Sequence, residues 1–206
     1  MGFFDNLKKA FQGNTTNSSN TNNAPKQSSN AGSTSAGPNK EGTVKFTFNN
    51  LPKTLEELKA LPEASMDTPF KTAALAILSF CIYSENKNEG IKCLNFLRGP
   101  KGELCEREKQ FFDDRIKSKN GTLIAKSYFK GATPDNEYQA PKPYILELFT
   151  NSHSYEQATY CTLHIMSGGA DSERQIQLRV ASGKWYLWEQ FIMVSIKAPK
   201  SQNPWG

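Results

Sequence analysis

The sequence predicts an α+β domain in which N-terminal helices pack on a C-terminal antiparallel β-meander, preceded by a disordered linker. Three observations predict this class. Apolar residues at helical spacing and helix-capping residues dominate the first half of the folded part. The last third consists of short runs rich in β-branched and aromatic residues, separated by turns. Before both lies a stretch with too little apolar surface to offset the entropy of ordering.

Residues 44–48 alternate apolar and polar side chains, which predicts a half-buried strand at the start of the domain. Helices follow. Thr54 is a typical N-cap for a short helix over residues 55–61, and Pro69 is a typical first residue for a helix that extends to Tyr83. That second helix is apolar nearly all round, so it should lie at the centre of the domain.

Two more helices are expected at about residues 88–97 and 103–117, joined by a turn at residues 99–102. Helical spacing predicts that they bury the side chains of Ile91, Leu94, Leu97, Leu104, Phe111, Phe112 and Ile116. We interpret all of these helices as scaffold. The proline-containing stretch after Gly121 should cross the surface as a long connection.

The last third should form strands over residues 144–149, 158–166, 174–181 and 184–196. The final run is long for a strand and should bend near Gln190. Short turns rich in glycine separate the later runs, so neighbouring strands should pair antiparallel.

Composition narrows the classes of function. The formal net charge of +5 is shared almost evenly between the first 42 residues and the rest, so nucleic acid is not an expected partner. The four cysteines form no C-x-x-C pair, and the chain opens without an apolar signal-peptide core, which favours reduced thiols in a cytoplasmic protein. The longest apolar run, residues 73–82, is too short to cross a bilayer.

Residues 1–12 form an amphipathic segment, and residues 13–42, rich in Asn, Ser, Thr and Gly, form the predicted linker to a single domain over residues 43–206. One helical face of the first segment carries Phe3, Phe4, Leu7 and Phe11. Burial against a protein groove or against the inner face of a membrane would stabilise this short helix, although either contact would be weak alone. The alternative is that the segment frays or packs on its own domain.

Several separated strings of the sequence resemble a known family. They are MDTPFKTAALAIL, LNFLRGPKGE, SYFKGATPDNEY and the stretch from Ser167 to Trp205. From about residue 43 to its end, the chain is similar to an uncharacterised domain of unknown function found in Firmicutes. The resemblance implies a bacterial, cytoplasmic protein, and it brings no established activity and no catalytic residue.

The sequence contains none of the common motifs for nucleotide binding, metal binding or nucleophilic catalysis. We therefore assign no catalytic residue, expect no cofactor and no metal, and lean against an enzyme.

The loop over residues 168–174 has two possible interpretations: its backbone amides bind an anion beside Arg174, or it is an ordinary hairpin connection. Period-two alternation places Trp185 on the sheet face opposite Tyr186 and Trp188, so at least one of these aromatic side chains should be exposed and the others should pack in the core. The candidate surface residues are Asp171, Arg174, Trp185, Trp188, Glu189 and Trp205.

The leading hypothesis is a non-enzymatic module that binds an unknown protein partner and is tethered by a flexible N-terminus. A second hypothesis is a small-ligand receptor or an enzyme with a pocket between helices and sheet, using dispersed groups such as Asp171, Arg174, Glu189 or His164. A third is peripheral membrane attachment through the N-terminal segment. A deep cavity with convergent polar groups would favour the second, and a solid core with an exposed aromatic patch would favour the first.

Overall fold

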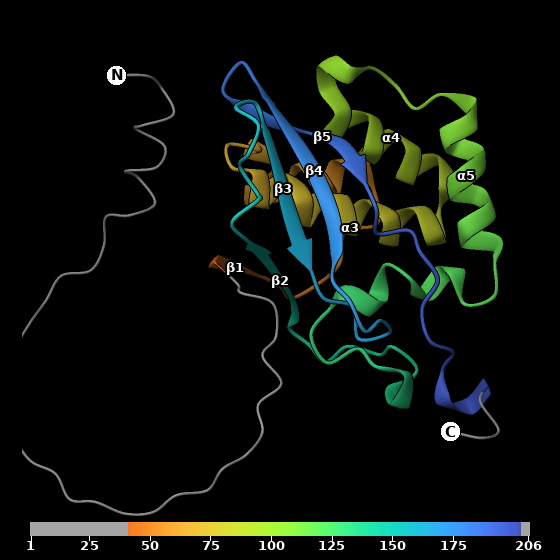
Figure 1. Cartoon of the computed structure of the whole chain (residues 1–206). Coiled ribbons are helices and arrows are strands. Elements are labelled where there is room, and N and C mark those ends of the chain that lie inside the picture. The colour runs from red at the N-terminus through yellow and green to blue at the C-terminus, as the bar shows by residue number, and fades with distance from the viewer. Residues whose placement is uncertain (1–40, 203–206) are drawn as a thin grey trace, which may run out of the picture. The chain divides into compact units, whose positions relative to one another are not determined.

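The computed structural model describes residues 41–202, and it has the predicted α+β class (Figure 1). In chain order the elements are β1 (Glu41–Phe48), α2 (Leu55–Lys59), α3 (Pro69–Glu85), α4 (Lys87–Arg98), α5 (Glu106–Lys117), β2 (Tyr144–Thr150), β3 (Tyr160–Ile165), β4 (Arg174–Ala181) and β5 (Lys184–Gln190). Short 3-10 turns lie at η1 (Pro62–Ser65), η2 (Gly99–Lys101), η3 (Gly121–Leu123), η4 (Lys126–Tyr128), η5 (Pro134–Asn136) and η6 (Lys200–Gln202). The predictions for residues 1–12, for Trp205 and for nearly all of the linker lie outside the described residues.

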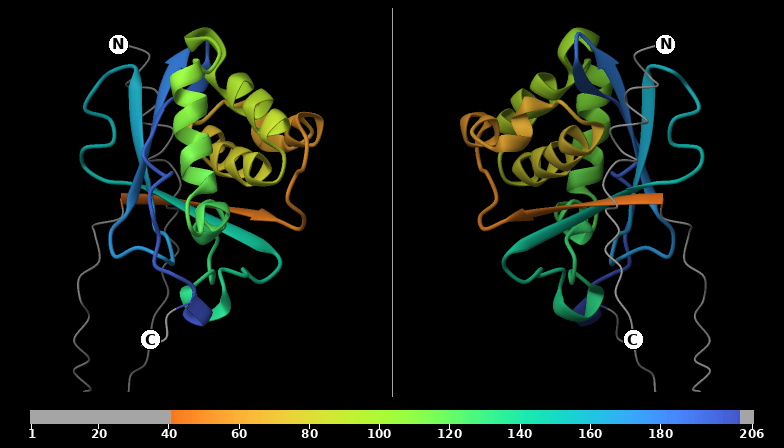
Figure 2. Two further views of the ribbon diagram at one scale, coloured as in Figure 1. Left: turned by 90° about the vertical axis from the view of Figure 1, so that its right-hand side faces the viewer. Right: turned by 90° about the vertical axis from the view of Figure 1, so that its left-hand side faces the viewer.

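The five strands form one antiparallel sheet in the order β1-β2-β3-β4-β5. Strand β1 precedes all the helices and yet pairs along its length with β2, so the sheet is not confined to the last third of the chain. Strands β2 and β3 pair only at Leu148 with Ile165 and at Phe149 with His164. The β1–β2 pair therefore diverges from the β3–β4–β5 part of the sheet, as Figure 2 shows.

Helix α3 lies at the centre of the domain, as predicted. Thr68 caps its first turn by accepting a hydrogen bond from the Lys71 amide, and Pro69 occupies the first helical position. Of its 17 residues, 14 are buried. The helix packs against α4 and against strands β2 to β5, and the helices lie on one side of these strands (Figure 2).

Helix α5 begins at Glu106, three residues later than predicted. The side chain of Arg98 donates to the carbonyl oxygens of Gly102 and Glu103, which holds this stretch outside the helix. The carboxylate of Glu108 then accepts the amide of Cys105 at 2.9 Å, which makes Cys105 the N-cap. Helix α4 is one residue longer at each end than the predicted 88–97.

Other boundaries also differ from the predictions, and α3, for example, continues to Glu85 instead of ending at Tyr83. Strand β1 begins at Glu41, inside the segment assigned to the linker. The first short helix ends at Lys59, and a 3-10 turn follows at Pro62. The last strand ends at Gln190, because the Gln190 side-chain oxygen accepts the amides of Ile192 and Met193 and turns the chain out of the ladder. The predicted bend is therefore confirmed, but the strand does not continue beyond it.

Candidate functional site

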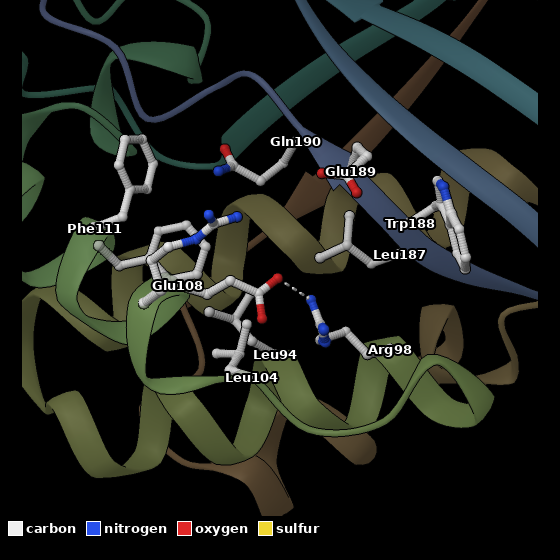
Figure 3. Close-up of a pocket in the computed structure, with 11 residues that line it drawn as sticks. Leu94, Arg98, Leu104, Glu108, Phe111, Leu187, Trp188, Glu189 and Gln190 are labelled. Carbon is white, nitrogen blue, oxygen red and sulfur yellow. Dashed lines mark hydrogen bonds and ion pairs between the residues drawn. The ribbon is translucent and has the colours of Figure 1, made fainter.

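A groove of about 350 Å³ lies between the end of helix α4, helix α5 and strand β5 (Figure 3). Its apolar lining consists of Leu94, Leu104, Phe112 and Leu187. Phe111 on α5 and Trp188 with Glu189 on β5 stand around this lining. The groove is open to solvent, since Phe111 is 42% exposed and Glu189 is also exposed.

A nearly buried ion pair fixes the helical wall of the groove. Arg98, whose side chain is 9% exposed, donates to Glu108 at 2.8 Å between Nη1 and Oε1. Burial by itself would raise the pKa of Glu108, but hydrogen bonds from the Cys105 amide and from Arg98 outweigh it, so the pKa lies below its usual range. Glu108 is therefore ionised at neutral pH and holds the start of α5 against the end of α4.

The opposite wall is shaped by a bulge in strand β5. Gln177 pairs with Glu189 and Leu178 pairs with Leu187, which leaves Trp188 as an extra residue between them. The Trp188 ring is held by two cations, with Lys101 Nζ 4.6 Å and Arg179 Cζ 4.8 Å from its centroid.

Lys101 also connects the η2 turn to this wall. Its ammonium group donates to the Trp188 carbonyl oxygen and lies 3.0 Å from Glu189 Oε1. Trp188 and Glu189 are therefore held in place by contacts within the domain.

Two hydrogen-bond donors that face the groove have no acceptor in the described part of the chain. Arg107 on α5 is exposed and makes no ion pair or hydrogen bond there. The side-chain oxygen of Gln190 on β5 accepts the amides of Ile192 and Met193, while its Nε2 group has no acceptor among residues 41–202. Figure 3 shows the Gln190 side chain projecting into the space between α5 and β5. The groove thus combines an apolar surface with donors on both walls.

The structure corrects the prediction that Phe111 is buried. Phe112 is 6% exposed and packs edge-on against Phe80 at 5.0 Å between ring centroids, whereas Phe111 points to the groove and solvent. The signal was present in the sequence. Consecutive helical residues project about 100° apart, so on a helix with one narrow buried face two adjacent phenylalanines are unequally buried.

The predicted surface residues divide between several places. Trp188 and Glu189 line the groove. Trp185 was predicted as a surface residue, but it lies in the core with 5% of its surface exposed, so its side chain is not accessible to a partner.

The two loop candidates lie outside the groove. Asp171 forms an ion pair with Lys197, and Arg174 donates to Ser172. No sequence motif pointed to the other polar residues of the groove, which are the lining residues Arg98, Arg107, Glu108 and Gln190 and the adjacent Lys101.

The glycine loop at residues 168–174 is a packed connection. The amides of Gly168, Gly169 and Ala170 donate to oxygen atoms of Ser127 and Ser167, so these amides are not free for an anion. A Cβ atom at Gly168 would lie 1.8 Å from the Ala132 carbonyl oxygen. Close approach of two backbones therefore explains this glycine, and the reading as an ordinary connection is the better one.

His164 is buried outside the groove. Its ring stacks on Phe149 at 5.7 Å, and its Nδ1 atom lies 2.9 Å from Glu173 Oε1. The distance is that of an ion pair, but the Nδ1 atom has no partner with hydrogen-bond geometry. No group of three or more His, Cys, Asp or Glu side chains within residues 41–202 is arranged to hold a metal ion.

A family model described as Domain of unknown function (DUF6935) matches residues 50–200. The chain belongs to this family. The match confirms the resemblance to an uncharacterised domain, while the bacterial source stays a prediction. All residues that line the groove lie within the DUF6935 domain, whereas β1 precedes the match. Comparisons with curated proteins and with solved structures each give no match.

The family description carries no activity, so function must be argued from the geometry of the domain. Within the described part of the chain, no helix combines the length and the apolar character that crossing a bilayer requires.

Proposed function

We propose that the DUF6935 domain is a non-enzymatic protein-binding module whose groove between α5 and β5 holds a segment of a partner protein. The exposed Phe111 beside the apolar lining of Leu94, Leu104 and Leu187 carries the proposal. Large aromatic side chains next to apolar pockets are the usual anchors of protein interfaces. Burial of Phe111 by a partner would remove apolar surface from water without any rearrangement of the core.

The rigidity of both walls supports this function. Glu108 is held by Arg98 on one wall, and Glu189 and Trp188 are held by Lys101 on the other. A site that is already ordered loses little conformational entropy when it binds. A partner segment would therefore meet a preformed surface.

Strand β5 is an edge strand, but a partner cannot extend the sheet along its first half. The Trp185 amide donates to the Met66 carbonyl oxygen at 2.8 Å, and the Trp185 carbonyl oxygen accepts from Thr72 at 2.7 Å. Lys101 occupies the Trp188 carbonyl oxygen. Since these edge groups are used, we propose that the partner is recognised by side chains in the groove and not by strand addition.

The groove suits a protein segment better than a small molecule. Its volume of about 350 Å³ is at the low end for ligand pockets, which usually bury most of their ligand. The exposed rim at Phe111 and Glu189 would leave a small molecule largely in water. The hypothesis of membrane attachment depends on residues outside the described part and stays a prediction.

The free cysteines support a reducing compartment for this module. Cys81, Cys93 and Cys161 are buried thiols, and Cys105 is an exposed one. An exposed free thiol is unusual in oxidising compartments. We therefore propose that the binding takes place in the cytoplasm.

The test is partner capture from native lysate with the full-length chain and two matched variants. Phe111→Ser changes the groove, whereas Phe191→Ser makes the same change at another exposed phenylalanine that does not line it. We expect recovery of a partner to fall about tenfold with Phe111→Ser and to stay unchanged with Phe191→Ser. Equal recovery with all three proteins would exclude the groove, and thermal unfolding would check that both variants fold.

A further inference from the structure

The hydrogen-bonding groups of the groove are unbalanced. The donors of Arg107 and Gln190 Nε2 have no acceptor in the described residues. Both carboxylates of the groove already accept from charged groups, Glu108 from Arg98 and Glu189 from Lys101. A site with unused donors and engaged carboxylates is complementary to a group that accepts hydrogen bonds.

The charges of the groove indicate that the hydrogen-bond acceptor supplied by the partner is negatively charged. The charge of Arg98 is compensated by Glu108, and Glu189 is compensated by Lys101, which leaves Arg107 as the uncompensated charge of the lining. The planar guanidinium fork of arginine fits a carboxylate with two parallel hydrogen bonds. A single uncompensated charge suits one acidic side chain and not a chain of phosphates, which would need several basic residues.

We infer that the partner segment is an acidic, apolar peptide, with a large apolar side chain on the lining beside Phe111 and an adjacent Asp or Glu that accepts from Arg107 and Gln190. This inference rests on the proposed function of the groove and specifies its ligand. The apolar side chain supplies most of the affinity, because it would pack against Phe111 and the lining residues Leu94, Leu104 and Leu187. Arg107 is exposed, so its contribution is mainly selectivity for charge.

Selection of random octapeptides on the immobilised full-length protein tests the inference. We expect the selected peptides to be enriched in Asp or Glu next to Leu, Ile, Phe or Trp. Arg107→Glu should reverse the preference to Lys or Arg at the same position. Lys117→Glu is the matched control, because it makes the same charge change on α5 at a residue that does not line the groove.

A selected peptide and its Glu→Gln version then provide a quantitative test by fluorescence anisotropy. We expect the Gln version to bind about tenfold more weakly to the wild-type protein and within about twofold of the Glu version to Arg107→Gln. Gln190→Glu keeps the oxygen that accepts the Ile192 and Met193 amides and removes the donor, so it should also weaken binding of the acidic peptide.

The outcomes separate this inference from the proposed function. Apolar peptides that show no acidic preference, and that are lost with Phe111→Ser, would overturn the inference and leave the groove as a protein-binding site. An acidic preference that persists in Arg107→Glu, or that disappears equally in Lys117→Glu, would overturn it as well. Displacement of the peptide by octanoate at equal concentration would assign the groove to small carboxylic acids instead. Selected peptides that are indifferent to Phe111→Ser would overturn both proposals.

Discussion

Helices α3 and α5 are held in the same domain by different means. Helix α3 is buried on all sides, and even its polar Thr72 and Ser79 side chains donate to carbonyl oxygens within the core. In α5, by contrast, the buried residues are Phe112 and Asp113. The central helix is stabilised by apolar packing, whereas α5 depends on a few specific contacts.

The contacts of α5 occur at two levels along the helix. Near its start, Glu108 binds Arg98 of α4. One turn later, Asp113 accepts from the Tyr83 hydroxyl at 2.8 Å and pairs with Lys87. These polar contacts fix the orientation of α5. The adjacent face of the helix, which carries Phe111, is not packed into the core, so the Phe111 side chain lines the groove. The helix that stabilises the core is therefore a different one from the helix that carries Phe111, the anchor of the proposed binding site.

Truncation in the central helix should have the largest effect on stability. Phe80 is completely buried and contacts Phe112, so Phe80→Ala removes packing from α3 and α5 together. We expect a loss of about 3 to 5 kcal/mol in the free energy of unfolding, measured by urea denaturation. Phe80→Leu should cost clearly less. A loss below about 1 kcal/mol for the alanine variant would show that α3 is not the main source of stability.

Removal of the Asp113 anchor should have an intermediate effect. Asp113→Ala removes the 2.8 Å acceptor of the buried Tyr83 hydroxyl, which keeps only its longer 3.4 Å bond to the Lys109 carbonyl oxygen, and it removes the carboxylate that pairs with Lys87. The free energy of unfolding should fall by about 1 to 3 kcal/mol. Asp114 is the exposed neighbour of Asp113 and accepts a hydrogen bond from the Gln110 side chain. Asp114→Ala should change the free energy of unfolding by less than about 0.5 kcal/mol. Equal effects at both positions would contradict the assignment of Asp113 as an anchor.

Low pH should weaken the attachment of α5, because it protonates Asp113 and Glu108. Burial alone would raise the pKa of Asp113, but hydrogen bonds from Lys87 and Tyr83 lower it overall, and the pKa of Glu108 is lowered as well. Because these pKa values are lower in the folded state, the stability they contribute is complete above their unfolded values of about 4 and is lost as the pH falls through the folded values.

The free energy of unfolding should therefore decline from about pH 5 downward, and the decline should be shallower in Asp113→Ala. Urea denaturation at a series of pH values measures both slopes. Identical slopes would mean that Asp113 titrates alike in the folded and unfolded chain.

The smallest effect on stability is expected at the groove itself. Phe111→Ala removes a half-exposed ring that meets the Phe112 ring edge-on and whose centroid lies 5.2 Å from Arg115 Cζ. The cost should be below about 1 kcal/mol by thermal unfolding. The same substitution at Phe112 should cost about 3 kcal/mol. If the two substitutions cost the same, Phe111 is a core residue and the groove loses its principal anchor.

The sequence by itself determined the elements whose signals are local. Pro69 after a capping threonine starts α3, and apolar residues on all sides of that helix require a central position. Period-two alternation placed Trp185 and Trp188 on different faces, and the predicted bend near Gln190 is present, although the strand ends there instead of continuing to residue 196. These predictions succeeded because helix caps and strand periodicity depend on neighbouring residues alone.

Only the tertiary structure decided which distant segments meet. Strand β1 pairs with β2, although all the helices lie between them in the sequence, and nothing local in residues 44–48 specifies that neighbour.

Long-range contacts also position α5. Arg98 sets the start of this helix by binding Gly102 and Glu108. The adjacent Phe111 and Phe112 differ in burial because only Phe112 packs against Phe80. The groove exists because α4, α5 and the β5 bulge converge, and its residues come from segments that look like scaffold when each is read alone. Periodicity specifies that a face is buried, but long-range packing specifies what buries it.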